Sequence, residues 1–424
     1  MTLKRGDPLS SYSHWNTALA GCADGLLIVD FELEQYWLPD AQPLLLTALY
    51  CIRGGALQVA VTDQDLVAGA YSPAQQFDLW VRQHHLVRAA PGLPLELLPT
   101  AIAKPWGREL WYTGVEQRGV CDFGAPGGRT PIPWLQAVLP QEAAGTPGQA
   151  LLLLKILDPV PQPVTGDLYF ELHETKREVY VVSQVDESAW PDGTGYIRYG
   201  FDPGQVAASA GEQDFRSKYL AAVEAYEKVR RVLDELPAGE PASPAQRALE
   251  QQLREAMHSF TCLRPLRVGD VLVVPPLLPH ALQHGVRTIE FQTPVYERKI
   301  LSFAQQVLTQ DHWDTREALD QALLCPPHEA PFECLRQESG VLVERIADCP
   351  DFEVRRVRLE RGVSITLQSI ADYALVLVVE GELALAGSTY RAEQALLVPR
   401  GYQDRLIAVN PTQPLVLLLA LPRR

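Results

Sequence analysis

The sequence predicts a mainly β protein, built from two similar antiparallel barrels in tandem with a helical segment inserted. Three observations favour this fold class. Short segments with the period-two alternation of strands fill most of the chain. Segments with helical periodicity interrupt them over about 211–260. A stretch around Leu272 recurs without a gap around Leu396, an offset too long for a solenoid repeat and best explained by two related β domains.

The N-terminal 100 residues are expected to form a β-rich region of their own. Short strand-like segments run from about 26 to 98 between turn signals such as "RGG" and "TDQD". No motif in residues 1–100 points to a particular chemistry, so the sequence leaves the role of this region open.

The first barrel is expected over residues 101–300. Its most informative strand lies in "GDLYFELHETKREVYVV", residues 166–182, where Tyr169, Glu171 and His173 share one face. Carboxylates and imidazoles are both common metal ligands, so this pair is a candidate for metal binding. An amphipathic strand with one solvated face is the ordinary explanation, so this stretch alone does not establish a site.

A helical pair is expected to interrupt this barrel over residues 211–260. "SPAQRALEQQLREAMHSF" has helical spacing, with Ser243 as the N-cap and Pro244 in the first turn. A further helix is expected over about 302–324, and the segment 301–335 is interpreted as this helix and a linker.

The second informative stretch is "GDVLVVPPLLPHALQHG", residues 269–285. Its spacing predicts a strand, a turn made rigid by proline, and His280 at the start of the returning strand. The repeat "EQALLVPRGYQDRL" has Asp404 in the place of His280. The C-terminal barrel, residues 336–424, is therefore expected to be a degenerate copy with a structural role.

These stretches resemble the two motifs of the cupin superfamily. The first motif is a glycine, then His-x-His, then a glutamate, and its positions fall on Gly166, Glu171, His173 and Glu178. Glu171 stands in the position of the first histidine. The resemblance implies antiparallel jelly-roll barrels with a metal inside.

The second cupin motif is a glycine, then Pro-x-Gly, then a histidine. Here it falls on Gly269, Pro275 and His280, with Leu277 in place of the usual glycine. The resemblance therefore implies that residues from the two motifs converge on one ion.

The chain is more specifically similar to type I mannose-6-phosphate isomerases. "LLLLKILD", "LYFELH", "KREVYVV" and "LRVGDVLVVPPLLPHALQHGVRTIEFQ" carry this resemblance, which covers roughly residues 104–292. It implies a metal-dependent aldose–ketose isomerase that converts mannose 6-phosphate to fructose 6-phosphate. The family's functional positions fall on Lys155, Glu171, His173, Glu178, His280 and Glu290.

The resemblance implies one divalent ion held by Glu171, His173, Glu178 and His280. Two imidazoles and two carboxylates suit zinc, the leading candidate, and also manganese or iron. The alternative is a degenerate cupin that has lost its metal.

Four residues are the candidates for catalysis and phosphate binding. Glu290 is the candidate base for moving a proton between C1 and C2 of the sugar, and His284 could assist it. Lys155, within an apolar strand, and Arg298 are the candidate cations for the phosphate. The family's arginine position falls at Ile300, and Arg298 keeps the same strand face two residues earlier.

Composition limits the partners and the compartment. The formal net charge of −15, from 52 acidic and 37 basic residues, argues against nucleic-acid and anionic-membrane surfaces. Seven cysteines without a CxxC pair, and an N-terminus without a leader pattern, indicate a cytoplasmic protein. The expected partners are a small-molecule sugar phosphate and, as a candidate, a second copy in a homodimer.

Three function classes compete at this point. The favoured one is the sugar-phosphate isomerase. The second is a non-catalytic regulatory cupin that binds metal or sugar. The third is an iron-dependent dioxygenase, a reaction that cupins also support, but the helical insert and the "IEFQ" strand do not favour it.

Overall fold

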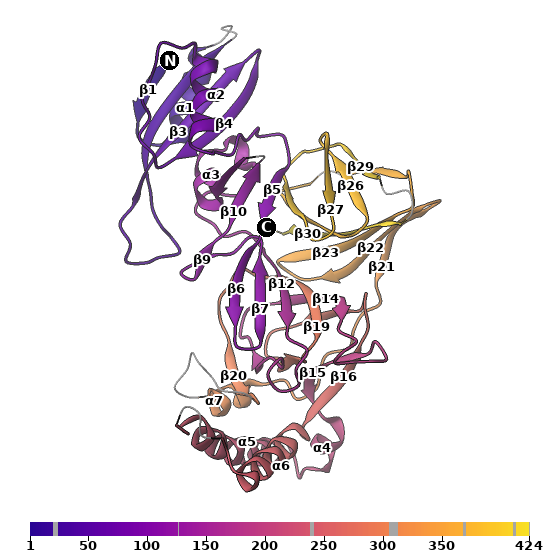
Figure 1. Ribbon diagram of the computed structural model, residues 1–424. Helices are drawn as coiled ribbons and strands as arrows, with labels where there is room; N and C mark the ends of the chain where they lie inside the picture. The colour runs from indigo at the N-terminus through magenta and orange to yellow at the C-terminus, as the bar shows by residue number, and fades with distance from the viewer. Residues whose placement is uncertain are drawn as a thin grey trace. The chain divides into compact units, whose positions relative to one another are not determined.

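The computed structural model describes residues 1–19, 24–125, 127–237, 241–304, 313–367, 370–409 and 413–423. Contacts between Cα atoms divide the chain into two compact units. The first contains Met1–Thr100, Trp111–Lys155 and Pro331–Arg424, and the second contains Ala101–Leu110 and Ile156–Ala330. The first unit therefore combines the two ends of the chain, drawn in indigo and yellow in Figure 1.

The first unit begins with a four-stranded sheet in the order β1-β2-β3-β4. β1 (Thr2–Arg5) runs parallel to β2 (Gly25–Leu33). β3 (Leu44–Arg53) and β4 (Ala56–Thr62) continue the sheet in antiparallel pairs. The many β-branched and aliphatic residues of these segments favour extended backbone with two distinct faces.

Three helices pack on this sheet. α1 (Pro8–Ala18) and α3 (Ile132–Val138) contact each other as well as the sheet. α2 (Pro73–Gln83) packs its buried side on β2 and β3, and it begins at a capping box formed by Ser72 and Gln75.

Two further sheets complete the first unit and share one hydrophobic core. The larger has nine strands from two distant parts of the chain, in the order β11-β10-β5-β28-β25-β30-β23-β22-β21. Its strands are β5 (Leu95–Leu98), β10 (Asp122–Ala125), β11 (Gly128–Pro131), β21 (Glu333–Glu338), β22 (Val341–Asp348), β23 (Phe352–Leu359), β25 (Ala374–Glu380), β28 (Ala395–Val398) and β30 (Leu415–Pro422). The smaller sheet contains β24 (Ser364–Thr366), β29 (Arg405–Ala408), β26 (Glu382–Leu385) and β27 (Ser388–Arg391). Two small elements complete the first unit. One is a short hairpin of β8 (Val115–Glu116) and β9 (Gly119–Val120), and the other is the 3-10 turn η1 (Pro140–Glu142) after α3.

The second unit is built on two sheets that contribute side chains to one core. The six-stranded sheet has β17 (Val271–Val274), β14 (Glu178–Val185), β19 (Val286–Gln292), β12 (Leu153–Pro159), β7 (Gly107–Trp111) and β6 (Thr100–Lys104), in that order. The five-stranded sheet has β16 (Thr261–Leu266), β15 (Gly195–Phe201), β18 (His280–Leu282), β13 (Phe170–Leu172) and β20 (Lys299–Ser302). This pairing of sheets encloses the inward faces of β13, β14, β18 and β19.

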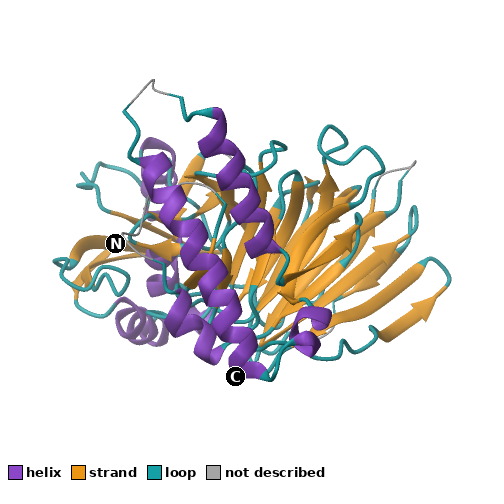
Figure 2. Cartoon of the chain, turned by 90° about the horizontal axis from the view of Figure 1, so that it is seen from below, coloured by secondary structure: helices purple, strands orange, loops and turns teal. Residues whose placement is uncertain are grey.

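Helices are inserted between β15 and β16. They are α4 (Pro203–Ala208), α5 (Glu212–Asp234) and α6 (Pro244–His258), and α7 (Thr315–Gln321) follows β20. α5 and α6 lie side by side, as the two longest helices in Figure 2 show. Phe215, Tyr219 and Val223 on one face of α5 join Phe170 and Phe201 of the five-stranded sheet in a second core.

The fold confirms the sequence prediction at the level of class. The protein is mainly β, most of its strand pairs are antiparallel, and helices are inserted among the strands of the second unit. Two closed barrels stay a prediction, as do the boundaries of the predicted domains. Of the helix expected over 302–324, the described part contains α7, and residues 305–312 lie outside the described ranges. Among the described residues no helix is both long and apolar enough to cross a membrane.

Candidate metal centre

Three predicted ligands, His173, Glu178 and His280, form a buried cluster in the second unit. One ligand atom from each lies within 4.8 Å of the others. Glu178 is central: its Oε1 is 3.2 Å from Nε2 of His173, and its Oε2 is 3.1 Å from Nε2 of His280. All three side chains are almost completely shielded from solvent.

Strand pairing explains why residues distant in sequence meet here. Glu171 on β13 pairs directly with His280 on β18, and His173 follows at the end of β13. Glu178 is the first residue of β14 and pairs with Gln292 of β19. Both strands belong to the six-stranded sheet, whereas β13 and β18 belong to the five-stranded sheet. The cluster therefore joins interior strands of the two sheets.

The tautomers of the two histidines fit a metal ion. Nδ1 of His173 is 2.9 Å from the carbonyl of Glu297, and Nδ1 of His280 is 3.0 Å from that of Leu278. A carbonyl only accepts, so each Nδ1 carries a proton, and in a neutral imidazole Nε2 then keeps its lone pair. Those lone pairs point at the Glu178 carboxylate, so acceptor atoms converge on a space that a cation would satisfy.

The electrostatics agree with a neutral imidazole beside a charged carboxylate. Burial lowers the pKa of His173, although the neighbouring Glu178 acts in the opposite direction. Burial alone would raise the pKa of Glu178, but the neighbouring Lys176 ammonium holds it well below its usual value. These are the protonation states that a divalent ion requires of its ligands.

Lys176 also lies in this cluster, and the sequence reasoning missed it. Its ammonium is 2.6 Å from Oε1 of Glu178, and its side chain is almost fully buried. Glu297 holds the turn in place, since its Oε1 accepts hydrogen bonds from the backbone amides of Thr175 and Lys176. Its nearness to Glu178 in the sequence was the available signal, but Lys176 lies in the loop before β14, where no strand periodicity predicts its direction.

Glu171, the fourth predicted ligand, lies at the margin of the cluster. Its Oε1 is 3.9 Å from Nε2 of His173, beyond hydrogen-bonding range, and its side chain is 21 % exposed. The described structure therefore gathers three of the four predicted ligands closely, with Glu171 beside them.

Glu290 lies inside the same unit, on β19. It is completely buried and pairs across the sheet with Tyr180 of β14. The Tyr180 hydroxyl donates a 2.8 Å hydrogen bond to Oε2 of Glu178. Burial raises the pKa of Tyr180, as do the charges of Glu178 and Glu290, so this phenol is a donor toward the cluster.

Arg298 stands in the loop before β20 rather than on a strand, so the strand-face argument for it does not apply. Its guanidinium lies over the ring of Tyr169, 5.1 Å from the centroid. Burial raises the pKa of Tyr169, Arg298 lowers it, and the carboxylates of Glu171 and Glu109 raise it. Arg298 and Glu171 therefore shift the pKa of the Tyr169 hydroxyl in opposite directions.

Two candidates remain, Lys155 and His284. Lys155 is buried on β12, the strand next to β19, and ends the Trp111–Lys155 segment of the first unit. His284 lies beyond the other end of β18 from His280, where its Nδ1 is 2.6 Å from Asp167 and its ring stacks on Trp190. The structure gives His284 these partners and does not bring it to the cluster.

The C-terminal repeat has no comparable cluster among its described residues. Asp404, the counterpart of His280, precedes β29 and accepts a hydrogen bond from the Tyr402 hydroxyl at 3.0 Å. Within the described ranges, the group formed by His173, Glu178 and His280 is the one in which metal-ligating atoms converge.

The fold is similar to that of solved mannose 6-phosphate isomerases. No protein-family model matches the chain, and no curated protein matches it. The solved structures that it resembles include mannose 6-phosphate isomerase from Bacillus subtilis, with a TM-score of 0.57 and 13% identity over 77% of this chain and 99% of that chain.

Two further solved structures have a similar fold. A zinc-bound mannose 6-phosphate isomerase and the Salmonella typhimurium enzyme, bound to fructose 6-phosphate and zinc, each give a TM-score of 0.54 and 12% identity. Each match covers 78% of this chain and 100% of the other. At this identity the similarity establishes a shared fold.

Proposed function

We propose that the protein is a metal-dependent aldose–ketose isomerase that acts on a sugar phosphate, with mannose 6-phosphate as the first substrate to test. The observation that carries this proposal is the buried His173–Glu178–His280 cluster. It occurs in a chain whose fold is similar to that of isomerases solved with zinc and with fructose 6-phosphate. The tandem cupin arrangement predicted from the internal repeat is part of the same proposal.

His173, Glu178 and His280 would hold the ion, with Glu171 as the fourth ligand after a small movement of its side chain. Zinc is the leading candidate, and the same donor set accepts manganese or iron. When bound, a divalent ion supplies a Lewis acid for the sugar oxygens at C1 and C2.

Glu290 is the proposed base that moves the proton between C1 and C2. Glu290 is completely buried and lies on the strand beside that of Glu178, so its carboxylate is within the same unit as the cluster. Tyr180, held by Glu178, is a hydroxyl donor on the same inward face. Arg298 and Lys155 are the proposed partners of the phosphate.

The direct experiment is a turnover assay with mannose 6-phosphate on protein reconstituted with zinc, manganese or iron. We expect fructose 6-phosphate to form and chelation to abolish its formation. Glu290→Gln should reduce turnover by about a hundredfold or more while preserving metal binding, as removal of a general base does. Glu212→Gln, at an exposed position at the start of α5, is the control and should leave turnover unchanged.

A second candidate function is a regulatory protein that binds metal or sugar without catalysis. The position of Lys176 favours it, because an ammonium on Glu178 neutralises the carboxylate without any metal. Sugar-phosphate binding without product formation, with each of the three metals, would support this candidate.

A further inference from the structure

One face of the N-terminal sheet is only half covered. Strand register places Leu3 and Arg5 of β1, Asp30 of β2, and Leu45 and Thr47 of β3 on the same face as the residues that pack against α2. α2 covers the end of this face that contains Leu26, Cys51 and Ala60. The other end has no described helix on it.

The two faces of this sheet are covered unequally. Trp15 of α1 packs on Gly25, and the Tyr50 hydroxyl bonds to the last residue of α3, so two helices cover the face opposite α2. A helix is about 10 Å wide and strands are about 4.8 Å apart, so four strands accommodate two helices. The face with α2 therefore has room for a second helix.

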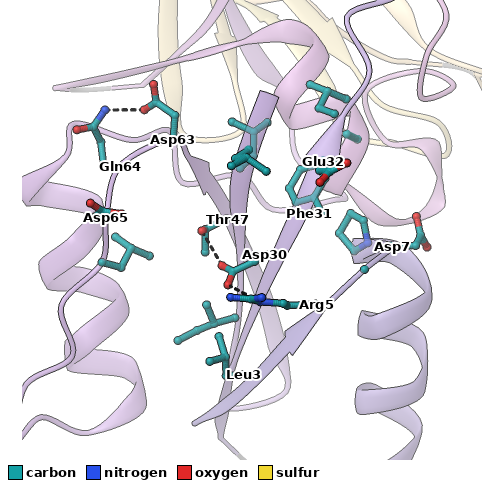
Figure 3. Close-up of a pocket in the computed structure, with 18 of the residues that line it drawn as sticks. Leu3, Arg5, Asp7, Asp30, Phe31, Glu32, Thr47, Asp63, Gln64 and Asp65 are labelled. Carbon is teal, nitrogen blue, oxygen red and sulfur yellow. Dashed lines mark hydrogen bonds and ion pairs between the residues drawn. The ribbon is translucent and has the colours of Figure 1, made fainter. Parts of the chain in front are cut away.

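A hollow of about 1200 Å³ includes the open end of this face and continues around the end of the sheet to Phe31, Leu33 and Leu46 on the opposite face. Figure 3 shows Leu3, Arg5, Asp30 and Thr47 together along its floor. Leu3 and Leu45 are 68% and 73% exposed, far more than leucines on a sheet face that a helix covers. The hollow thus offers apolar contacts to an incoming element.

The hollow is also strongly acidic. Five carboxylates line it, with one guanidinium: Asp7, Asp30, Glu32, Asp63, Asp65 and Arg5. Asp30 is 3.8 Å from Arg5 and accepts a hydrogen bond from Thr47. Glu32, Asp63 and Asp65 are exposed and have no ion pair with any described residue. An occupant with basic side chains would complement the negative charge of these three carboxylates.

We propose that this hollow binds a basic amphipathic helix of a partner protein. The apolar stripe of such a helix would cover Leu3 and Leu45 and would complete the layer that α2 begins. Its lysine or arginine side chains would pair with Glu32, Asp63 and Asp65. A second copy of this chain fits less well, because its net charge of −15 would oppose association at an acidic surface.

The test uses the full-length chain and a fluorescently labelled helical peptide of about 18 leucine and lysine residues, long enough to be helical when bound. Fluorescence anisotropy should show saturable binding that weakens with salt. Leu45→Gln and Glu32→Lys, both at exposed positions, should each weaken it by about tenfold. Leu249→Gln and Glu212→Lys, exposed on α6 and α5, are the controls and should bind as the wild type does.

Two results would overturn the proposal. If Glu32→Lys and Glu212→Lys weakened binding equally, the peptide would be responding to the net charge of the chain and not to this hollow. If sedimentation showed a wild-type dimer that Leu45→Gln converts to a monomer, the face would belong to a second copy.

Discussion

The arrangement of lone pairs around Glu178 is the residue-scale basis of the metal proposal. Backbone carbonyls bind the Nδ1 protons of His173 and His280, so in the neutral imidazoles both Nε2 lone pairs face the Glu178 carboxylate. Acceptors held this close are stable only with a cation nearby. Lys176 is one such cation, and a divalent ion would be another.

Loss of a histidine ligand should therefore remove the metal. We expect His280→Ala to bind zinc at least about a hundredfold more weakly than the wild type, which should hold about one equivalent. His14→Ala, on the exposed side of α1, should bind as the wild type does. Elemental analysis and competition titration with a chromogenic chelator measure both quantities. Unchanged affinity in His280→Ala would place the ion elsewhere.

Removal of the competing ammonium should have the opposite effect. The Lys176 ammonium must leave Glu178 when a divalent ion arrives, so Lys176→Gln should bind zinc about tenfold more tightly. Arg177→Gln makes the same change of charge at the neighbouring residue and should alter the affinity little. The same competition titration measures both variants, and weaker binding in Lys176→Gln would show that Lys176 supports the ion instead.

Sequence alone could predict some of these residues and not others. His173, Glu178 and His280 occupy motif spacings, so local pattern was enough to nominate them. Glu297 acts through its backbone carbonyl and its reach to Thr175, which no side-chain pattern reveals. His284 was nominated from its spacing to His280, but the turn after β18 directs it to Asp167.

At the scale of elements, a part-buried polar contact joins α6 to β15. Nη2 of Arg198 is 3.1 Å from Nδ1 of His258, the last residue of α6, and Nη1 donates to Thr261 at 2.7 Å. Arginine only donates, so Nδ1 of His258 accepts and this imidazole is neutral. Burial, followed by the charge of Arg198, lowers the pKa of His258 to about 3.

This contact predicts a loss of stability in mild acid. The histidine pKa in the unfolded chain is about 6.5, so below that pH the unfolded state binds a proton that the folded state does not. The free energy of unfolding should fall by up to about 1.4 kcal/mol per pH unit below 6.5 from this group. His258→Asn keeps an acceptor for Arg198, so its urea unfolding should depend less steeply on pH than that of the wild type. His14→Asn should keep the wild-type slope, and equal slopes in all three proteins would contradict the assignment.

Elements with local signals were the most predictable. α6 begins at the Ser243 N-cap, where Gln246 completes a capping box, because the sequence of one turn contains the whole signal. The repeat is also visible locally: Leu272 lies on β17 and Leu396 on β28, each followed by a proline turn and a short strand. The number and closure of the sheets depend on distant pairings, which periodicity does not encode.

At the scale of the whole molecule, the C-terminal segment is part of a sheet that begins before residue 100. Ala395 and Leu397 of β28 pair with Leu97 and Leu95 of β5. Local patterns do not predict this pairing, because nearly 300 residues separate the two strands and the repeat around Leu396 has no counterpart around Leu97. The expectation that residues 1–100 form a separate region stays a prediction.

Removal of the C-terminal segment should therefore expose an apolar sheet edge. A 1–335 truncation loses β28, leaving β5 without a partner on that side, together with much of the surrounding core. We expect this truncation to aggregate, since unpaired edges and exposed cores promote association. Solubility after expression and light scattering measure this outcome. A soluble truncation that still binds zinc would mean that the segment folds independently.

The central claim is that the buried cluster supports isomerisation through proton transfer at C2 of a sugar phosphate. The most direct measurement is exchange of the C2 proton of mannose 6-phosphate with deuterated solvent, followed by NMR, with zinc and after chelation. The account predicts exchange with zinc, none after chelation, and a loss of about a hundredfold or more in Glu290→Gln. Absence of exchange from every common hexose and pentose phosphate, despite measurable sugar binding, would contradict it, and so would exchange that survives chelation.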